Sequence, residues 1–242
     1  FAVAHHVIPF TAGKPVWSES MQKVSMLFLF VTIPPFFVSS ADGGEFLQNI
    51  GAILMTLGLL PLLAGSFNMV ATAASSPEKI VKSPGAFAAT AAMLILPIYA
   101  VGGFFTGMDT FVGMDKLGSM AQTIDTGFIS TVGSLMMLAA LFTSYPLIAG
   151  KKLAKAKNAQ LAVWFTIVGG VASTIAALMG DFTAYAVSNS GVEDAVASTE
   201  GFFLVSAAMF YMVTLASIIA ALAMIHTGRP NNASYSDTSV KS

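Results

Sequence analysis

Histidine is the side chain that most often holds haem iron and copper in membrane redox proteins, and this chain contains three. His5 and His6 are adjacent near the beginning of the chain, and His226 lies near its end. We expect His5 and His6 to be interfacial residues with no metal, and His226 to lie at a helix C-terminus in the headgroup region. The absence of Cys excludes thiolate metal sites, iron–sulfur clusters and disulfides.

Ionisable groups inside a membrane usually mark a path for ions or protons, so acidic residues come next. The sequence predicts none in the membrane interior, because the nearest, Asp181, follows an apolar segment that ends at Gly180. This argues against a pump, an antiporter or a proton channel. The more polar groups within the apolar segments are predicted to form hydrogen bonds between helices. They are Asn68, Thr72, Tyr99 and Tyr145.

The elements that carry these side chains are long apolar runs. With 55% hydrophobic and 10% charged residues, the composition predicts an all-α integral membrane protein. A helix needs about 20 apolar residues to cross a bilayer. The six predicted transmembrane helices are residues 21–39, 46–73, 86–107, 127–149, 161–180 and 202–225. They form a single membrane domain over residues 1–227, which begins with a short apolar tail and a polar turn and is followed by a polar tail, 228–242.

The loops between these runs differ in charge. Ten of the 11 Lys and Arg residues fall in the terminal segments and in alternate loops, and Lys116 falls on the other side. Acidic residues show the opposite distribution. Because lysine-rich loops stay in the cytoplasm, this partition predicts six spans with both termini cytoplasmic. The net charge of −1 argues against a nucleic-acid partner.

Two stretches resemble a known family. They are VIPFTAGKPVWSESMQKVSMLFLFVTIPPFF, from Val7, and SYPLIAGKKL, from Ser144, which is followed by AVWFTIVGGVASTIAALMGDF. Both are similar to the catalytic subunit I of haem–copper oxidases, closest to the B-type branch. The resemblance extends from about Val7 to Arg229 and corresponds to the seventh to twelfth helices of that subunit. It implies an up-and-down arc of six helices, half of the family fold.

The resemblance also shows where the metal ligands of the family would fall. The tenth helix of the family opens with Gly-His-Phe-His, and the matching segment here is Thr126–Ile129. The two haem-binding histidines therefore fall on Gly127 and Ile129, and a copper-binding pair falls on Val38 and Ser39. An oxidase centre needs six histidines. We therefore expect no catalytic, cofactor-binding or metal-binding residue in this chain, with haem and copper held by partner subunits.

The resulting hypothesis is a cofactor-free scaffold or docking subunit of a terminal oxidase-like respiratory complex in a bacterial or archaeal cell membrane. It would not be catalytic by itself, but would belong to a cytochrome or quinol oxidase complex and contact other membrane subunits. Two alternatives stay open: the C-terminal half of a split, active subunit I, and a channel or transporter for a small neutral solute. Close docking contacts are expected at Gly169-Gly170, at Ala172–Ala177 and between Gly58 and Gly65.

Overall fold

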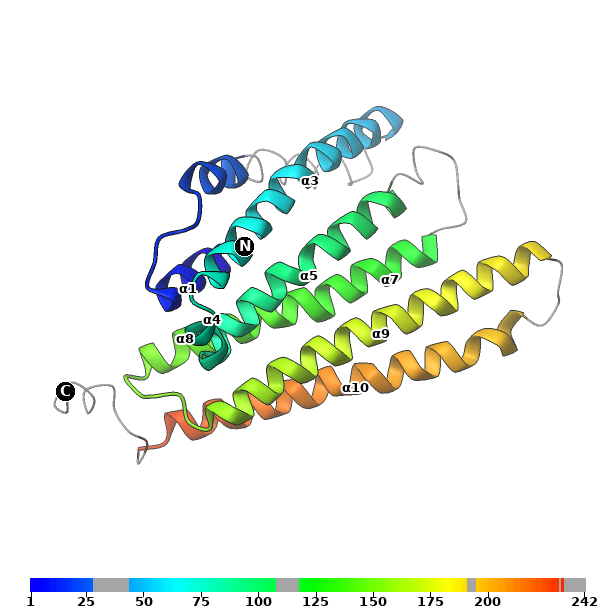
Figure 1. Cartoon of the computed structure of the whole chain (residues 1–242). Helices are drawn as coiled ribbons and strands as arrows, with labels where there is room; N and C mark the ends of the chain where they lie inside the picture. Colours follow the sequence, from blue (N-terminus) through cyan, green and yellow to red (C-terminus); the bar gives the residue numbers. More distant parts are fainter. Residues whose placement is uncertain (28–43, 108–117, 191–194, 231, 233–242) are drawn as a thin grey trace.

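The computed structural model describes residues 1–27, 44–107, 118–190, 195–230 and 232, and these contain helices and no strand. The all-α prediction is therefore confirmed for the described chain (Figure 1). The elements are α1 (Ala2–Ala12), α3 (Gly44–Ala74), α4 (Pro77–Lys82), α5 (Pro84–Gly107), α7 (Gly118–Phe128), the π-helix η1 (Ile129–Gly133), α8 (Ser134–Ile148), α9 (Ala156–Ser190) and α10 (Ala195–Gly228).

Five described helices are long and apolar enough to cross a membrane. The helices α7, η1 and α8 form one of them as a continuous run, and α3, α5, α9 and α10 are the others. Each packs against the next one along the chain, and successive helices run in opposite directions (Figure 1). Of the predicted first span, 21–39, residues 21–27 are helical and the remainder lies outside the described residues. The six-span prediction, with both termini on one side, stays a prediction.

Two helices extend well beyond the spans predicted from apolar length. The fifth predicted span was expected to end at Gly180, but α9 continues to Ser190, and the fourth begins at Gly118 rather than at residue 127. Gly180 lies inside α9, and its missing side chain lets the helix approach Phe202 and Phe203 of α10 closely. As a consequence Asp181, expected beyond a span, lies within a helix that is long enough to cross the membrane.

The expected apolar tail at the beginning of the chain forms helix α1, which also includes Thr11 and Ala12 of the expected polar turn. It packs against α3, α4, α5 and α8, and Val7 and Ile8 are buried in these contacts. The helix ends at Gly13, whose φ of 66° lies in the left-handed region that favours glycine at a helix C-terminus. Eleven residues rise only about 16 Å, so α1 is too short to cross a bilayer.

Beside three of the glycines expected to face a partner subunit, the space is filled by other residues of this chain. A side chain at Gly169 would meet the carbonyl of Met209 and the side chain of Met212 in α10. One at Gly170 would meet Thr131 of η1, and one at Gly65 would meet the ring of Phe1. At Gly169, Gly170 and Gly65 the expectation of docking contacts is therefore wrong, because these glycines bring parts of this chain together. For Gly58 and Ala172–Ala177 it stays a prediction.

At one end of the bundle, α4, the loop 149–155 and the end of α10 lie near one another (Figure 1). We call this the lysine-rich end, and polar contacts hold its loops together. The ammonium group of Lys151 donates to the carbonyls of Pro230 and Asn232, at 2.9 and 3.1 Å. The amide of Ala154 donates to the Thr227 hydroxyl at 3.0 Å. The loop between α9 and the preceding span is thus fixed to the end of α10.

Candidate functional site

The two haem-ligand positions implied by the resemblance lie on different sides of one helix. Ile129 is 68% exposed and faces away from the bundle. Gly127 is buried, and a side chain there would overlap Thr174 of α9 and approach the Tyr99 ring of α5 within 2.8 Å. The space that a ligand at residue 127 would need is filled by these two side chains. Val38 and Ser39 lie outside the described residues.

Tyr99 and Thr174 belong to a group of three buried hydroxyls that connects three elements. The Tyr99 hydroxyl lies 3.1 Å from the Thr131 hydroxyl of η1 and 2.9 Å from that of Thr174 in α9. Thr174 also donates to the carbonyl of Gly170 in its own helix, at 2.9 Å. We call Tyr99, Thr131 and Thr174 the hydroxyl cluster. It joins α5, η1 and α9, and it confirms the prediction that Tyr99 bonds between helices.

The π-helix η1 begins two residues after Gly127 and contains Thr131. A π-turn adds a residue to a helical turn, shifts the side chains that follow, and occurs often at functional sites. Here the shift coincides with the place where Gly170 and Thr131 come into close contact. The local irregularity thus lies at the junction of α5, α9 and the α7–α8 run.

The other polar groups predicted to bond between helices behave differently. Asn68 and Thr72 of α3 bind the main chain of the segment after α1: the amides of Ser18 and Trp17 donate to them at 2.8 and 2.9 Å. They attach this segment to α3 rather than joining two spans. For Tyr145 the prediction stays open.

A polar hollow of about 300 Å³ adjoins the hydroxyl cluster, between α7 and η1 on one side and α10 on the other, with α9 behind it. We call it the hydroxyl groove. Its lining residues are Ser119, Gln122, Thr123, Thr126, Gly127, Ser130, Ser173, Thr174, Ala177, Asp181, Phe203, Ser206 and Phe210. Nine of these carry a polar side chain, and Asp181 is the charged one.

Two hydrogen bonds connect the helices around the groove. The Thr123 hydroxyl of α7 donates to the Asp181 carboxylate at 2.6 Å, and Asp181 is only 8% exposed. The hydroxyls of Ser173 in α9 and Ser206 in α10 lie 3.0 Å apart. Because α9 contributes both Ser173 and Asp181, two turns apart, these bonds fix α7 and α10 to the same face of α9.

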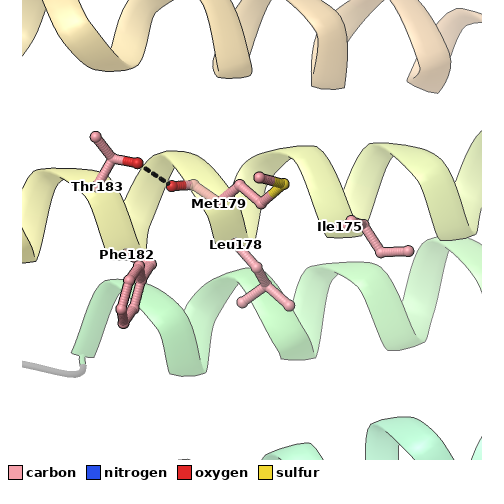
Figure 2. A pocket seen from close by; sticks show the side chains of 5 residues that line it. All are labelled: Ile175, Leu178, Met179, Phe182 and Thr183. Atoms are coloured by element: carbon pink, nitrogen blue, oxygen red, sulfur yellow. Dashed lines mark hydrogen bonds between the residues drawn. The ribbon is translucent and has the colours of Figure 1, made fainter.

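A second hollow, of about 260 Å³, lies on the opposite face of α9. Figure 2 shows its lining, four apolar side chains and Thr183, all from α9. The Thr183 hydroxyl donates to the carbonyl of Met179 at 2.7 Å, so its donor is used within the helix (Figure 2). This surface has the chemistry of lipid contact, whereas the hydroxyl groove has the chemistry of a polar ligand site.

The histidines lie at separate places. The Nδ1 atom of His5 is 3.1 Å from the carbonyl of Phe1, while its buried Nε2 atom has no partner among the described residues. Burial lowers the pKa of the His5 imidazole, which favours the neutral ring. His6 stacks on Phe10, and His226 Nε2 lies 3.2 Å from the Lys155 ammonium. In the described part of the chain, no three His, Asp or Glu side chains form a group that could hold a metal ion.

The fold and the site define a multi-pass helical membrane protein with a polar groove among its apolar helices. Among known proteins, no family model matches this chain, and no curated protein matches it either. The likeness to haem–copper oxidase subunit I therefore stays a prediction from the stretches quoted above.

Sequence reasoning missed the hydroxyl groove, although its polar residues have helical spacing. Ser119, Thr123, Thr126 and Ser130 recur every three or four residues along α7 and η1. Ser173 and Asp181 likewise fall on one face of α9. Two such polar stripes in apolar segments indicate helices that face each other, and this signal could have located the groove.

Proposed function

We propose that this chain is a cofactor-free membrane subunit that docks through α10 into a terminal oxidase-like respiratory complex. The observation that carries the docking role is Tyr211, at the middle of α10, whose side chain is 69% exposed. No hydrogen-bond partner for its hydroxyl lies among the described residues. A phenol hydroxyl that faces hydrocarbon lacks water to bind, so a polar group of a neighbouring subunit is the partner that would satisfy it.

The burial of α10 supports the same proposal. Of the five candidate spans, α10 has the smallest buried share, 22% against 39% for each of the others. Its contacts are mainly with α9, through a stripe of buried residues spaced by three and four: Val213, Ala216, Ala220, Ala223 and Thr227. The remaining surface of α10, which includes Tyr211, is available to a partner.

The cofactor-free part of the proposal is supported by the packing at Gly127. The split-oxidase alternative needs space for a ligand at this position, but Tyr99 and Thr174 occupy it. The link to an oxidase-like complex is supported by the two sequence stretches, from Val7 and from Ser144. A small-solute channel or transporter is the second candidate, and the hydroxyl groove favours it, because nine polar side chains line a hollow within apolar helices.

Photo-crosslinking in the native membrane tests the docking proposal. A photoreactive amino acid would replace Tyr211, and the matched control would replace Leu94, which is 61% exposed at the middle of α5. We expect residue 211, and not residue 94, to crosslink to a different membrane protein, and the complex isolated with this chain to contain haem that is absent from the chain alone.

Three results would contradict this proposal. One is equal crosslinking at both positions, which would indicate random encounters in the bilayer. Another is a crosslink to a second copy of the same chain. The last is a stoichiometric Soret band in the isolated chain, which would favour the split-oxidase alternative.

A further inference from the structure

The hydroxyl groove holds one buried negative charge without a nearby balancing charge in its lining. The side chain of Asp181 is more than nine-tenths buried, and the Thr123 hydroxyl donates to it at 2.6 Å. None of the described residues that line the groove is Lys, Arg or His. One hydrogen bond from a hydroxyl does not offset the cost of desolvating a carboxylate, which is several kcal/mol per ion in proteins.

The position of Asp181 along α9 determines from which side a solute reaches it. The span within α9, Ala156–Val187, has 32 residues, which rise about 48 Å and exceed the hydrocarbon thickness of about 30 Å. With the lysine-rich end in the headgroups, about 20 residues after Lys157 cross the hydrocarbon, so Asp181 lies about four residues, or roughly 6 Å, beyond its far boundary. Solutes dissolved at that surface therefore have a short route to the carboxylate.

The groups around Asp181 are oxygen ligands. Among the described residues that line the groove, six hydroxyl side chains besides that of Thr123 accompany the Gln122 amide. Oxygen donors of this kind suit hard cations such as the alkali metal and alkaline earth ions, whereas imidazole and thiolate suit transition metals. With a single carboxylate, one positive charge neutralises the groove, and a divalent ion would leave a net positive charge in an apolar surrounding.

The size of the groove suits a cation that keeps part of its hydration shell. A water molecule occupies about 30 Å³ in the liquid, so about 300 Å³ has room for an ion and several waters. The two hydrogen bonds across the groove, Thr123 to Asp181 and Ser173 to Ser206, hold its walls in place.

We propose that the hydroxyl groove is a binding site for a monovalent metal cation, with the Asp181 carboxylate as the charged ligand and the surrounding hydroxyls as neutral ligands. This role is independent of the docking role of α10. It is also distinct from haem or copper binding, since every polar ligand that the described lining offers is an oxygen or an amide.

Thermal unfolding of the purified full chain, with any subunits that it retains, tests the site. Sodium, potassium or lithium chloride would replace N-methyl-D-glucamine chloride at constant ionic strength and pH. We expect at least one of the metal ions to raise Tm saturably in the wild type, and Asp181→Asn to weaken its apparent affinity at least tenfold. Asp125→Asn is the matched control, because Asp125 is an exposed acid of α7 outside the groove, and it should respond like the wild type.

If Asp181→Asn does not fold, Ser173→Ala and Ser206→Ala weaken the site without removing its charge. Binding of radioactive ²²Na⁺ to the wild type, with unlabelled ions as competitors, measures the affinity of the site directly. Equal stabilisation of Asp181→Asn and wild type would overturn the proposal, as would no response of the wild type to any of the three ions. It would also be overturned if Asp181→Asn removed a dependence of Tm on pH while the metal ions had no effect, because the groove would then hold a proton.

Discussion

The helices α5 and α10 are both long apolar helices, but their surroundings differ. Helix α5 contacts α1, α3, α4, α7, η1, α8 and α9, whereas α10 contacts mainly α9. Each carries a tyrosine near the middle: Tyr99 of α5 is 8% exposed and bonds two threonines, and Tyr211 of α10 is 69% exposed. The same residue type thus holds the bundle together in one helix and, in our proposal, holds a partner in the other.

This difference shows that hydropathy alone does not tell which helix is central. Helix α10 is more apolar than α5, yet it is the less buried of the two. In a bilayer, apolar surface is satisfied by lipid, and close packing and hydrogen bonds decide which helices meet. Small residues and hydroxyls at helical spacing are therefore better guides to helix contacts in this protein than apolar content.

The largest loss of stability is expected from a substitution at the contact between α9 and α10. In Gly169→Leu, the new side chain would meet the Met209 carbonyl and the Met212 side chain, and the main chain cannot move aside without separating the two helices. We expect a loss of about 3 kcal/mol or more in the free energy of unfolding. Unfolding in mild detergent, followed by circular dichroism, measures it.

Gly133→Leu is the control for this variant. Outside its own helix, no atom lies within 4 Å of the position that a Cβ at Gly133 would take, so the new side chain has open space. We expect its stability to stay within about 0.5 kcal/mol of the wild type. Similar losses in both variants would show that α9 and α10 are not in contact at Gly169.

A smaller loss in the free energy of unfolding is expected at Gly127 of α7, which faces Tyr99 of α5. The added methyl group of Gly127→Ala would overlap Thr174 and approach the Tyr99 ring, which we expect to cost about 1–3 kcal/mol. Thr174→Ala removes most of the overlapping atoms, so the double variant should be more stable than the sum of the two single losses implies. Strict additivity of the two losses would show that residue 127 does not face Thr174.

Much of the fold was predictable, and what was missed has physical causes. Apolar length found five spans, but not α1, because an 11-residue helix owes its stability to contacts with distant helices rather than to its own sequence. Helix α9 extends beyond the predicted span because apolar length locates only the apolar part of a helix, while Gly180 and the residues after it continue the helix and pack against α10. The hydroxyl groove was missed because Thr123, Ser173 and Asp181 form a site only when three helices meet.

Removing the hydroxyl oxygen from Tyr99 or from Tyr211 compares the roles of α5 and α10 with a change of one atom. Tyr99→Phe removes the hydroxyl that bonds Thr131 and Thr174, and we expect a loss of about 1 kcal/mol in the stability of the isolated chain. Tyr211→Phe should leave that stability unchanged and lower the fraction of the chain that co-purifies with its partner. Unfolding of the isolated chain and native gel analysis of membrane extracts give the two measurements. A stability loss from Tyr211→Phe as large as that from Tyr99→Phe would remove the distinction.

The smallest effect is expected at the lysine-rich end, where the loop before α9 joins it to α10. Lys155 has a φ of 53°, in the left-handed region that costs a non-glycine residue about 1–2 kcal/mol. Lys155→Gly relieves this cost, loses some backbone entropy and removes an exposed contact with His226 that is worth little. We expect a net gain of about 0.5 kcal/mol in the free energy of unfolding. Lys157→Gly removes the same charge at the second residue of α9, where no left-handed strain is relieved, and should instead cost about 0.5 kcal/mol or less, because glycine is the weaker helix former. Opposite signs in parallel thermal scans would support a strained junction, whereas destabilisation by both variants would show that the Lys155 side chain, rather than its backbone, holds the loop against α10.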